Sequence, residues 1–133
     1  MNKDETISSL SKLAEACNQG SQIFLGWAPN VVEPALQELA VGIGQQLIQF
    51  ESELQDVIRN AGGKNLAPAP LIPAPIDRNG LLMLGKISLA LILLYYQQAA
   101  RATNLESVCA TIKYQHVQMQ QAYEQLVSLH RAA

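Results

Sequence analysis

The stretch LLMLGKISLALILLYY, residues Leu81–Tyr96, decides the fold of this 133-residue chain. Fourteen of its sixteen residues are apolar or glycine, and only Lys86 and Ser88 interrupt the run. A transmembrane helix needs about 20 mostly apolar residues, and a charge near the bilayer centre costs about 2.5–3.5 kcal/mol. The stretch therefore predicts a buried helix of a soluble bundle, with no transmembrane segment. Because a helix that is apolar nearly all round must be covered on several sides, a second subunit is a natural partner.

The composition favours one helical domain and excludes several functions. The chain is 49% hydrophobic with a net charge of −2, and its nine basic residues are scattered. With only 5% aromatic residues, it lacks the basic stripe and stacking platforms typical of nucleic-acid binding. The N-terminal MNKDETISSL has no apolar run of signal-peptide length, which predicts a cytoplasmic protein. Cys17 and Cys109 fall in apolar helical patterns and are interpreted as structural thiols.

Helical periodicity predicts a single four-helix domain over residues 1–133, with helices at about 4–27, 31–61, 78–102 and 104–131. The first helix has an apolar seam with strict three-four spacing. The positions of this seam are Ile7, Leu10, Ala14, Cys17, Ser21 and Phe24. Gly20 lies inside the first helix, where it indicates either a bend or a close backbone approach.

The second helix is framed by start and stop signals. Asn30 and Glu33 have the spacing of a capping box, and Gly62 with Gly63 supplies a turn after the last helical residue. Between them runs another seam with four-three spacing. Its positions are Leu36, Ala40, Ile43, Leu47, Phe50, Leu54, Val57 and Ala61.

A proline-rich crossover is predicted over residues 62–77, between the second and third helices. Residues 64–76 hold four of the six prolines in the chain. Repeated proline removes amide donors and favours extended geometry, so we interpret the segment as a stiff strap across the bundle. The alternative is a ligand for a proline-recognising groove. Asp77 or Asn79 then caps the third helix.

The fourth helix carries the sharpest polar feature of the predicted core. Its seam is predicted at Leu105, Cys109, Ile112, His116, Met119, Tyr123, Leu126 and His130. His116 and Tyr123 share one inward face in this pattern. We interpret His116 as a hydrogen-bonded core histidine, with a metal ligand or proton shuttle as the alternative.

A two-metal site in such a bundle requires converging carboxylates and Glu-x-x-His pairs, because two cations need several negative oxygens. The chain has no Glu-x-x-His, and its third helix has no acidic residue between Asp77 and Asn104. The remaining candidates for a residual site holding iron or another divalent metal are His116, Glu15, Glu51 and Glu53. The sequence also lacks a phosphate loop and a nucleophile elbow.

The N-terminal half contains ETISSLSKLAEACNQGSQIF with a Cys-x-x-Gly-x-x-x-Phe pattern, followed by PALQEL, by QFESEL and by a closing Gly-Gly. On these motifs, residues 5–63 resemble an uncharacterised group of small bacterial ferritin-like four-helix proteins. The resemblance implies a ferritin-like bundle whose ancestors held two metal ions. Where that group tends to carry acidic residues, this chain has Gln19, Ser21 and Gln22, and Tyr123 stands near the expected histidine. We therefore expect Gln19, Gln22, His116 and Tyr123 to be core polar residues that bond one another, since amides and hydroxyls do so without a hard cation.

The sequence thus predicts an all-α, ferritin-like four-helix bundle without enzymatic activity or cofactor. We expect it to act through homo-oligomerisation, most simply as a homodimer, or through an unknown protein partner. The interface is predicted on the third helix, at Leu84, Ile87, Leu91, Leu94 and Tyr95. The alternatives are the residual metalloprotein and a carrier of an apolar ligand between the second and third helices.

Overall fold

The computed structural model describes residues 3–64, 77–103 and 105–131. Regular structure in these ranges is entirely helical, which confirms the predicted all-α class with four helices. The elements are α1 (Lys3–Trp27), the 3₁₀ turn η1 (Ala28–Asn30), α2 (Pro34–Asn60), α3 (Arg78–Ala102) and α4 (Glu106–Arg131). α2 begins at Pro34 instead of residue 31, and α4 begins at Glu106 instead of 104. Most of the predicted proline-rich crossover, 62–77, lies outside the described residues.

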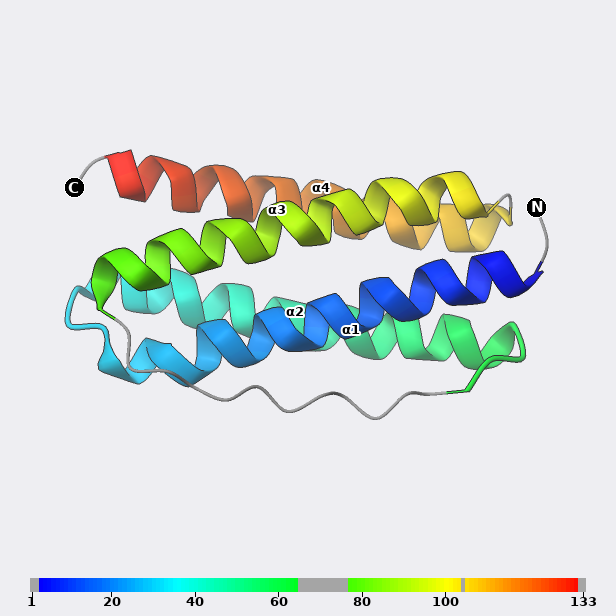
Figure 1. Ribbon diagram of the computed structural model, residues 1–133, viewed down its shortest axis with the longest axis horizontal. Coiled ribbons are helices and arrows are strands. Elements are labelled where there is room, and N and C mark those ends of the chain that lie inside the picture. The colour runs from blue at the N-terminus through cyan, green and yellow to red at the C-terminus, as the bar shows by residue number, and fades with distance from the viewer. Residues whose placement is uncertain (1–2, 65–76, 104, 132–133) are drawn as a thin grey trace.

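The four helices form an elongated bundle whose chain ends lie at opposite ends (Figure 1). α1 is antiparallel to α2 and α3 is antiparallel to α4, whereas α2 and α3 run in the same direction (Figure 1). α1 packs against both α2 and α3, and α4 packs against α3 and more loosely against α2. Among the described residues, α2 and α3 occupy diagonal corners of the bundle, as do α1 and α4.

The helix ends follow the predicted signals at two of three places. Asp77 caps α3 by accepting a hydrogen bond of 2.7 Å from the Gly80 amide. After α2, Gly62 adopts a positive φ of 92°, which glycine alone adopts without a steric penalty. The capping box at Asn30 and Glu33 is wrong, because Glu33 precedes α2 without a side-chain cap. Its carboxylate instead binds the guanidinium of Arg78 at 2.6 Å, which joins the start of α2 to that of α3.

The buried seams of α1 and α2 agree largely with the predicted ones. In α1, all the predicted positions except the half-buried Ile7 are buried. In α2, the first six predicted positions are buried, after which Ile58 takes the place of Val57. α1 continues without a break through Gly20, where an added Cβ would lie 3.0 Å from methyl carbons of Ile92 and Leu47. Close packing is therefore the reason for glycine at this position.

The seam of α4 is rotated from the predicted one. Its buried positions are Val108, Ile112, Gln115, Met119, Ala122 and Leu126. Cys109, His116, Tyr123 and His130 are half-buried, and Leu105 is exposed. The core of α4 therefore has Gln115 where the sequence predicts His116, and Ala122 where it predicts Tyr123.

Candidate functional site

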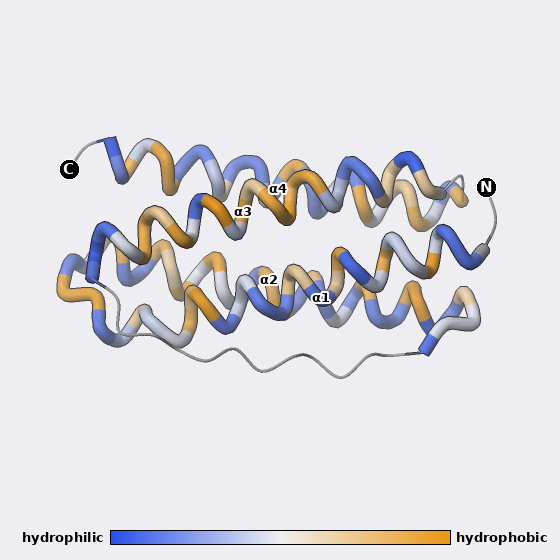
Figure 2. The backbone as a smooth tube through the Cα atoms, viewed as in Figure 1, coloured by the Kyte–Doolittle hydropathy of each residue, from blue (hydrophilic) through white to orange (hydrophobic). Residues whose placement is uncertain are grey.

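An apolar stripe runs along the side of α3 that faces away from the core. We name it the outer stripe and define it as Met83, Ile87, Ala90, Leu91 and Leu94. Its four large side chains are 59%, 59%, 45% and 47% exposed in that order, and Ala90 is exposed between them. The buried face of the same helix includes Leu82, Gly85, Leu89 and Ile92. At 100° per residue, the two sets lie on opposite sides of α3, and apolar colour therefore dominates much of this helix in Figure 2.

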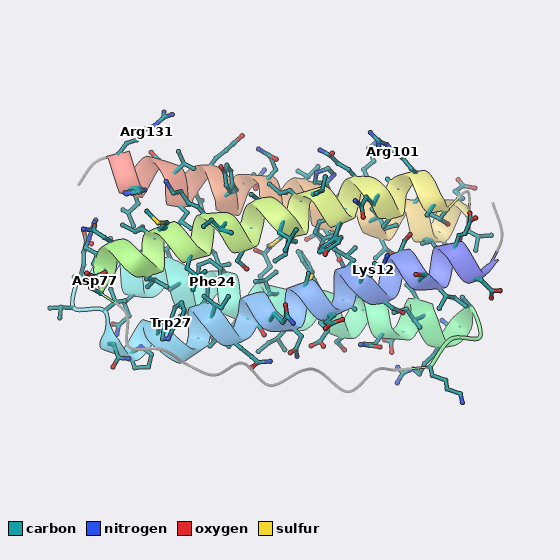
Figure 3. All side chains as sticks on the ribbon, viewed as in Figure 1. Lys12, Phe24, Trp27, Asp77, Arg101 and Arg131 are labelled. Atoms are coloured by element: carbon teal, nitrogen blue, oxygen red, sulfur yellow. The ribbon has the colours of Figure 1, made fainter. Side chains whose placement is uncertain are left out.

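The structure divides the predicted interface residues into two groups. Ile87, Leu91 and Leu94 lie in the outer stripe, whereas Leu84 and Tyr95 are half-buried and pack against the core. Met83 was missed by the sequence reasoning, although its position four residues before Ile87 was a usable signal. Arg101 near the end of α3 points away from the bundle (Figure 3).

A buried chain of polar side chains connects all four helices at mid-bundle. The Tyr96 hydroxyl of α3 donates to Gln115 Oε1 of α4 at 2.8 Å, and Gln115 Nε2 donates to Glu53 Oε1 of α2 at 2.9 Å. The Cys17 Sγ of α1 lies 3.9 Å from the Tyr96 hydroxyl. Since the single tyrosine proton is given to Gln115, the thiol is the donor in this contact. Cys17, Tyr96 and Gln115 are fully buried, and none of them is left unpaired.

Burial determines the protonation states of Cys17 and Tyr96 in this row of polar side chains. It raises the pKa of the Cys17 thiol to about 12, an effect that the hydrogen bond with Tyr96 partly offsets and that the charge of Glu51 increases. Burial also raises the pKa of Tyr96, with a further contribution from Cys17. Cys17 is therefore a neutral thiol at physiological pH, which makes it a poor nucleophile. Within the described chain both cysteines are free, and the half-buried Cys109 donates to the Thr103 carbonyl at 3.6 Å.

The predicted core polar residues lie at the edge of the bundle instead of inside it. The ring of His116 stacks on that of Tyr96, with centroids 5.6 Å apart and planes 7° from parallel. Gln19, Gln22 and Tyr123 are half-buried. Gln22 donates to Asn18 Oδ1 at 2.5 Å, so this predicted residue bonds an amide of its own helix.

The predicted metal candidates do not converge. Glu15 is exposed, Glu51 accepts a bond of 3.1 Å from Asn18, and Glu53 accepts bonds from both Gln115 and Gln49. The ring of His116 stacks on that of Tyr96. Across residues 3–64, 77–103 and 105–131, no three His, Cys, Asp or Glu side chains form a group that could hold a metal ion.

A long groove separates α2 from α4 along part of their length, and we name it the amide groove. Its volume is about 1000 Å³. The groove is lined by Ala35, Glu38, Leu39, Gly42, Ile43, Gln45, Gln46, Gln49, Gln118, Gln121, Ala122, Gln125, Ser128 and Leu129. Six of these residues are glutamines, and a bond of 3.5 Å from Gln46 to Gln118 crosses between the two helices. Sequence reasoning did not identify this groove, although the glutamines of α4 recur every three or four residues.

A second cavity of about 400 Å³ lies at the end of the bundle where α1 meets the start of α3. Trp27, Asp77, Arg78 and Leu81 are among its lining residues, and Figure 3 shows Trp27 and Asp77 at this end. Neither this cavity nor the amide groove lies between α2 and α3, where the sequence places an apolar ligand. Those helices are diagonal, and described core side chains such as Leu47 and Ile92 fill the space between them.

One described helix, α3, is long and apolar enough to cross a membrane by composition alone, and a third of its most apolar window is buried in the bundle. The same composition is found in core helices of soluble proteins. In comparisons with known proteins, no family model and no curated protein matches this chain. The function is therefore inferred from the geometry of the outer stripe, the polar chain and the amide groove.

Proposed function

We propose that this protein is a non-enzymatic, ferritin-like helical bundle that acts by associating with further copies of itself through the outer stripe. The observation that carries the proposal is the alignment of four large apolar side chains, each about half exposed, along the side of α3 opposite its core face. Contiguous apolar surface of this kind marks interaction sites, whereas single exposed apolar residues do not. Val117 of α4, which is also half exposed, lies outside the outer stripe and offers a matched position for comparison.

The ferritin-like assignment is supported by the order and direction of the helices. α2 ends at Asn60 and α3 begins at Arg78, at opposite ends of the bundle, so the chain has one long connection between two parallel helices (Figure 1). A single long crossover is typical of ferritin-like bundles. A bacterial, cytoplasmic setting belongs to the same proposal and depends on the resemblance of residues 5–63 and on the N-terminal sequence.

A non-enzymatic role is supported by the chemistry at the bundle centre. There the polar groups satisfy one another, because the thiol, hydroxyl, amide and carboxylate of Cys17, Tyr96, Gln115 and Glu53 form one continuous chain. Such a network fixes four helices relative to one another. It leaves the thiol with a raised pKa instead of activating it.

Sedimentation velocity of the full chain tests the association. We expect the wild-type mass to exceed that of a monomer and to rise with concentration, whereas Ile87→Asp should sediment as a folded monomer with unchanged helical circular dichroism. Val117→Asp, at a matched exposed apolar position on α4, should behave as wild type. A monomeric wild type up to about 100 μM, well above the micromolar dissociation constants of specific complexes, would refute the proposal. Flotation of the wild type with lipid vesicles would replace it with a membrane role.

A further inference from the structure

We propose that the outer stripe of one copy docks into the amide groove of the next copy, so that the chains assemble head to tail. This inference rests on the proposed function, because it names the surface that receives the outer stripe. Within residues 3–64, 77–103 and 105–131, no segment covers either surface, and the two surfaces belong to different helices. Their shape, length and charge are complementary, as the following observations show.

The groove is a built feature of the bundle, because α2 and α4 are held apart over only half of their shared length. In the other half, Phe50 and Tyr114 meet edge to face with centroids 6.2 Å apart, and Gln115 bonds to Glu53. In the open half, small residues line the space between the helices, including Gly42 and Ala122. A Cβ added at Gly42 would have no neighbour within 4 Å, so an incoming helix can approach the α2 backbone closely here.

The lining of the groove suits an amphipathic helix. Leu39, Ile43, Ala122 and Leu129 supply apolar surface, and glutamines from both helices form the rims. This arrangement of an apolar floor with a polar rim is typical of helix-in-groove recognition. Along α2 the groove extends from Ala35 to Gln49, or about 21 Å, and the outer stripe from Met83 to Leu94 is about 17 Å long.

Charge also favours a second copy as the occupant. Glu38 is the only charged residue among the described lining residues of the groove. Lys86 is the only charged residue of α3 between Asn79 and Ala100. When a partner's α3 lies parallel to α2 with Lys86 beside Glu38, Ala90 falls beside Gly42 and Leu91 beside Ile43. This register places the smallest residue of the stripe against the smallest residue of the groove, where helices approach most closely.

The outer stripe and the amide groove lie on different sides of the bundle, so one chain can use both surfaces at the same time. α3 contacts α1 and α4, whereas the amide groove lies between α2 and α4, so a chain that donates its stripe keeps its own groove free. Head-to-tail interfaces generate open chains or closed rings, whereas a symmetric contact between two α3 helices stops at a dimer. We therefore expect assemblies larger than dimers at high concentration.

A mixing experiment tests this arrangement with the full chain. Gly42→Trp fills the groove and should abolish self-association, as Ile87→Asp does by removing the stripe. The control Gly26→Trp changes an equally open glycine of α1 outside the groove and should associate as wild type. A mixture of Gly42→Trp and Ile87→Asp should form a 1:1 dimer that grows no further, because one variant keeps a stripe and the other keeps a groove.

Self-association of Gly42→Trp alone would overturn the head-to-tail inference while leaving association through the outer stripe intact. Self-association of Ile87→Asp alone would overturn the proposed function itself. A charge-swap cycle gives a second test that does not depend on the folding of Gly42→Trp. Glu38→Lys and Lys86→Glu should each weaken association about twofold to fivefold, the size of an exposed ion pair, and the double variant should restore it. Additive losses in the double variant would refute the pairing.

Discussion

The Tyr96 hydroxyl connects two other helices in the core, because it contacts Cys17 of α1 and donates a hydrogen bond to Gln115 of α4. Tyr96→Phe leaves Gln115 Oε1 buried without this donor. We expect a loss of about 1–2 kcal/mol in the free energy of unfolding, measured by urea denaturation. Tyr95→Phe, one residue away and outside the polar chain, serves as the matched control. If Tyr96→Phe and Tyr95→Phe lowered the free energy of unfolding equally, the hydrogen bonds of the Tyr96 hydroxyl would contribute nothing to stability.

The raised pKa of Cys17 predicts a loss of stability at alkaline pH. Below the ordinary thiol pKa of 9.0, the folded and unfolded states both keep the proton. Above 9.0 the unfolded thiol ionises, while the folded thiol keeps its proton until about pH 12, so folding becomes less favourable as pH rises. The expected slope is about 1.4 kcal/mol per pH unit in this window, and Tyr96 adds to it above its own unfolded pKa.

Urea unfolding at a series of pH values from 8 upward measures this slope. Cys17→Ala removes one titrating group and should therefore show a shallower decline than wild type above pH 9, whatever its stability at neutral pH. Parallel curves for the two proteins would contradict the assigned role of the buried thiol.

Sequence reasoning placed the wrong residue of α4 in the core, and the reason is physical. Histidine and tyrosine are more often buried than glutamine, so a single sequence favours His116 over Gln115. The burial of Gln115 is compensated by bonds to Tyr96, Glu53 and the Phe50 carbonyl, which lie on two other helices. No local pattern in α4 contains this information, because all three partners are distant in the sequence.

At the scale of the helix, the predicted seam of α2 holds near its start and drifts in its last turns. A strict seven-residue repeat drifts about 20° per heptad from a straight α-helix, so the buried position of α2 moves from Val57 to Ile58 in its last turns. Periodicity therefore predicts that a helix exists and which face is buried. Over a long helix, however, the predicted positions shift away from the residues that are actually buried. The prediction of a capping box failed for a different reason. The Glu33 carboxylate forms an ion pair with Arg78, which is 45 residues away in the sequence.

The close packing around Gly85 of α3 predicts that Gly85→Ala destabilises the folded protein. An added methyl would lie 3.0 Å from two ring carbons of Phe24 and 3.1 Å from Leu126. Phe24 is fully buried and cannot move aside without disturbing the core. We expect the overpacking to cost about 1–3 kcal/mol despite the better helix propensity of alanine. Thermal unfolding followed by circular dichroism measures this loss.

Gly26→Ala is the control for this substitution, because an added Cβ at Gly26 has nothing within 4 Å. It should be neutral or slightly stabilising, since alanine favours the helix over glycine. If Gly85→Ala were as stable as Gly26→Ala, the contact between α3 and Phe24 would be looser than the structure indicates.

For the whole molecule, the sequence identified α3 as the helix that one bundle cannot cover, and the structure shows which of its residues remain exposed. Ile87, Leu91 and Leu94 are exposed, whereas Leu93 is 9% exposed and belongs to the core. The amide groove could not be predicted, because it depends on the separation of α2 and α4, and this separation is set by contacts at the other half of the bundle. Composition alone gives no information on how closely two neighbouring helices pack.

The proposed self-association through the outer stripe also predicts how the stability of the whole molecule depends on concentration. An interaction that exists only between folded chains stabilises them by mass action, so the unfolding temperature should rise with protein concentration. We expect this rise for the wild type over a hundredfold range, and a flat profile for Ile87→Gln, whose polar side chain weakens the stripe without adding a charge. Val117→Gln, at an exposed apolar position of α4 outside the outer stripe, should keep the wild-type dependence. An unfolding temperature of the wild type that does not change with concentration would mean that the folded chain gains nothing from its neighbours, and the exposed face of α3 would then need a different explanation.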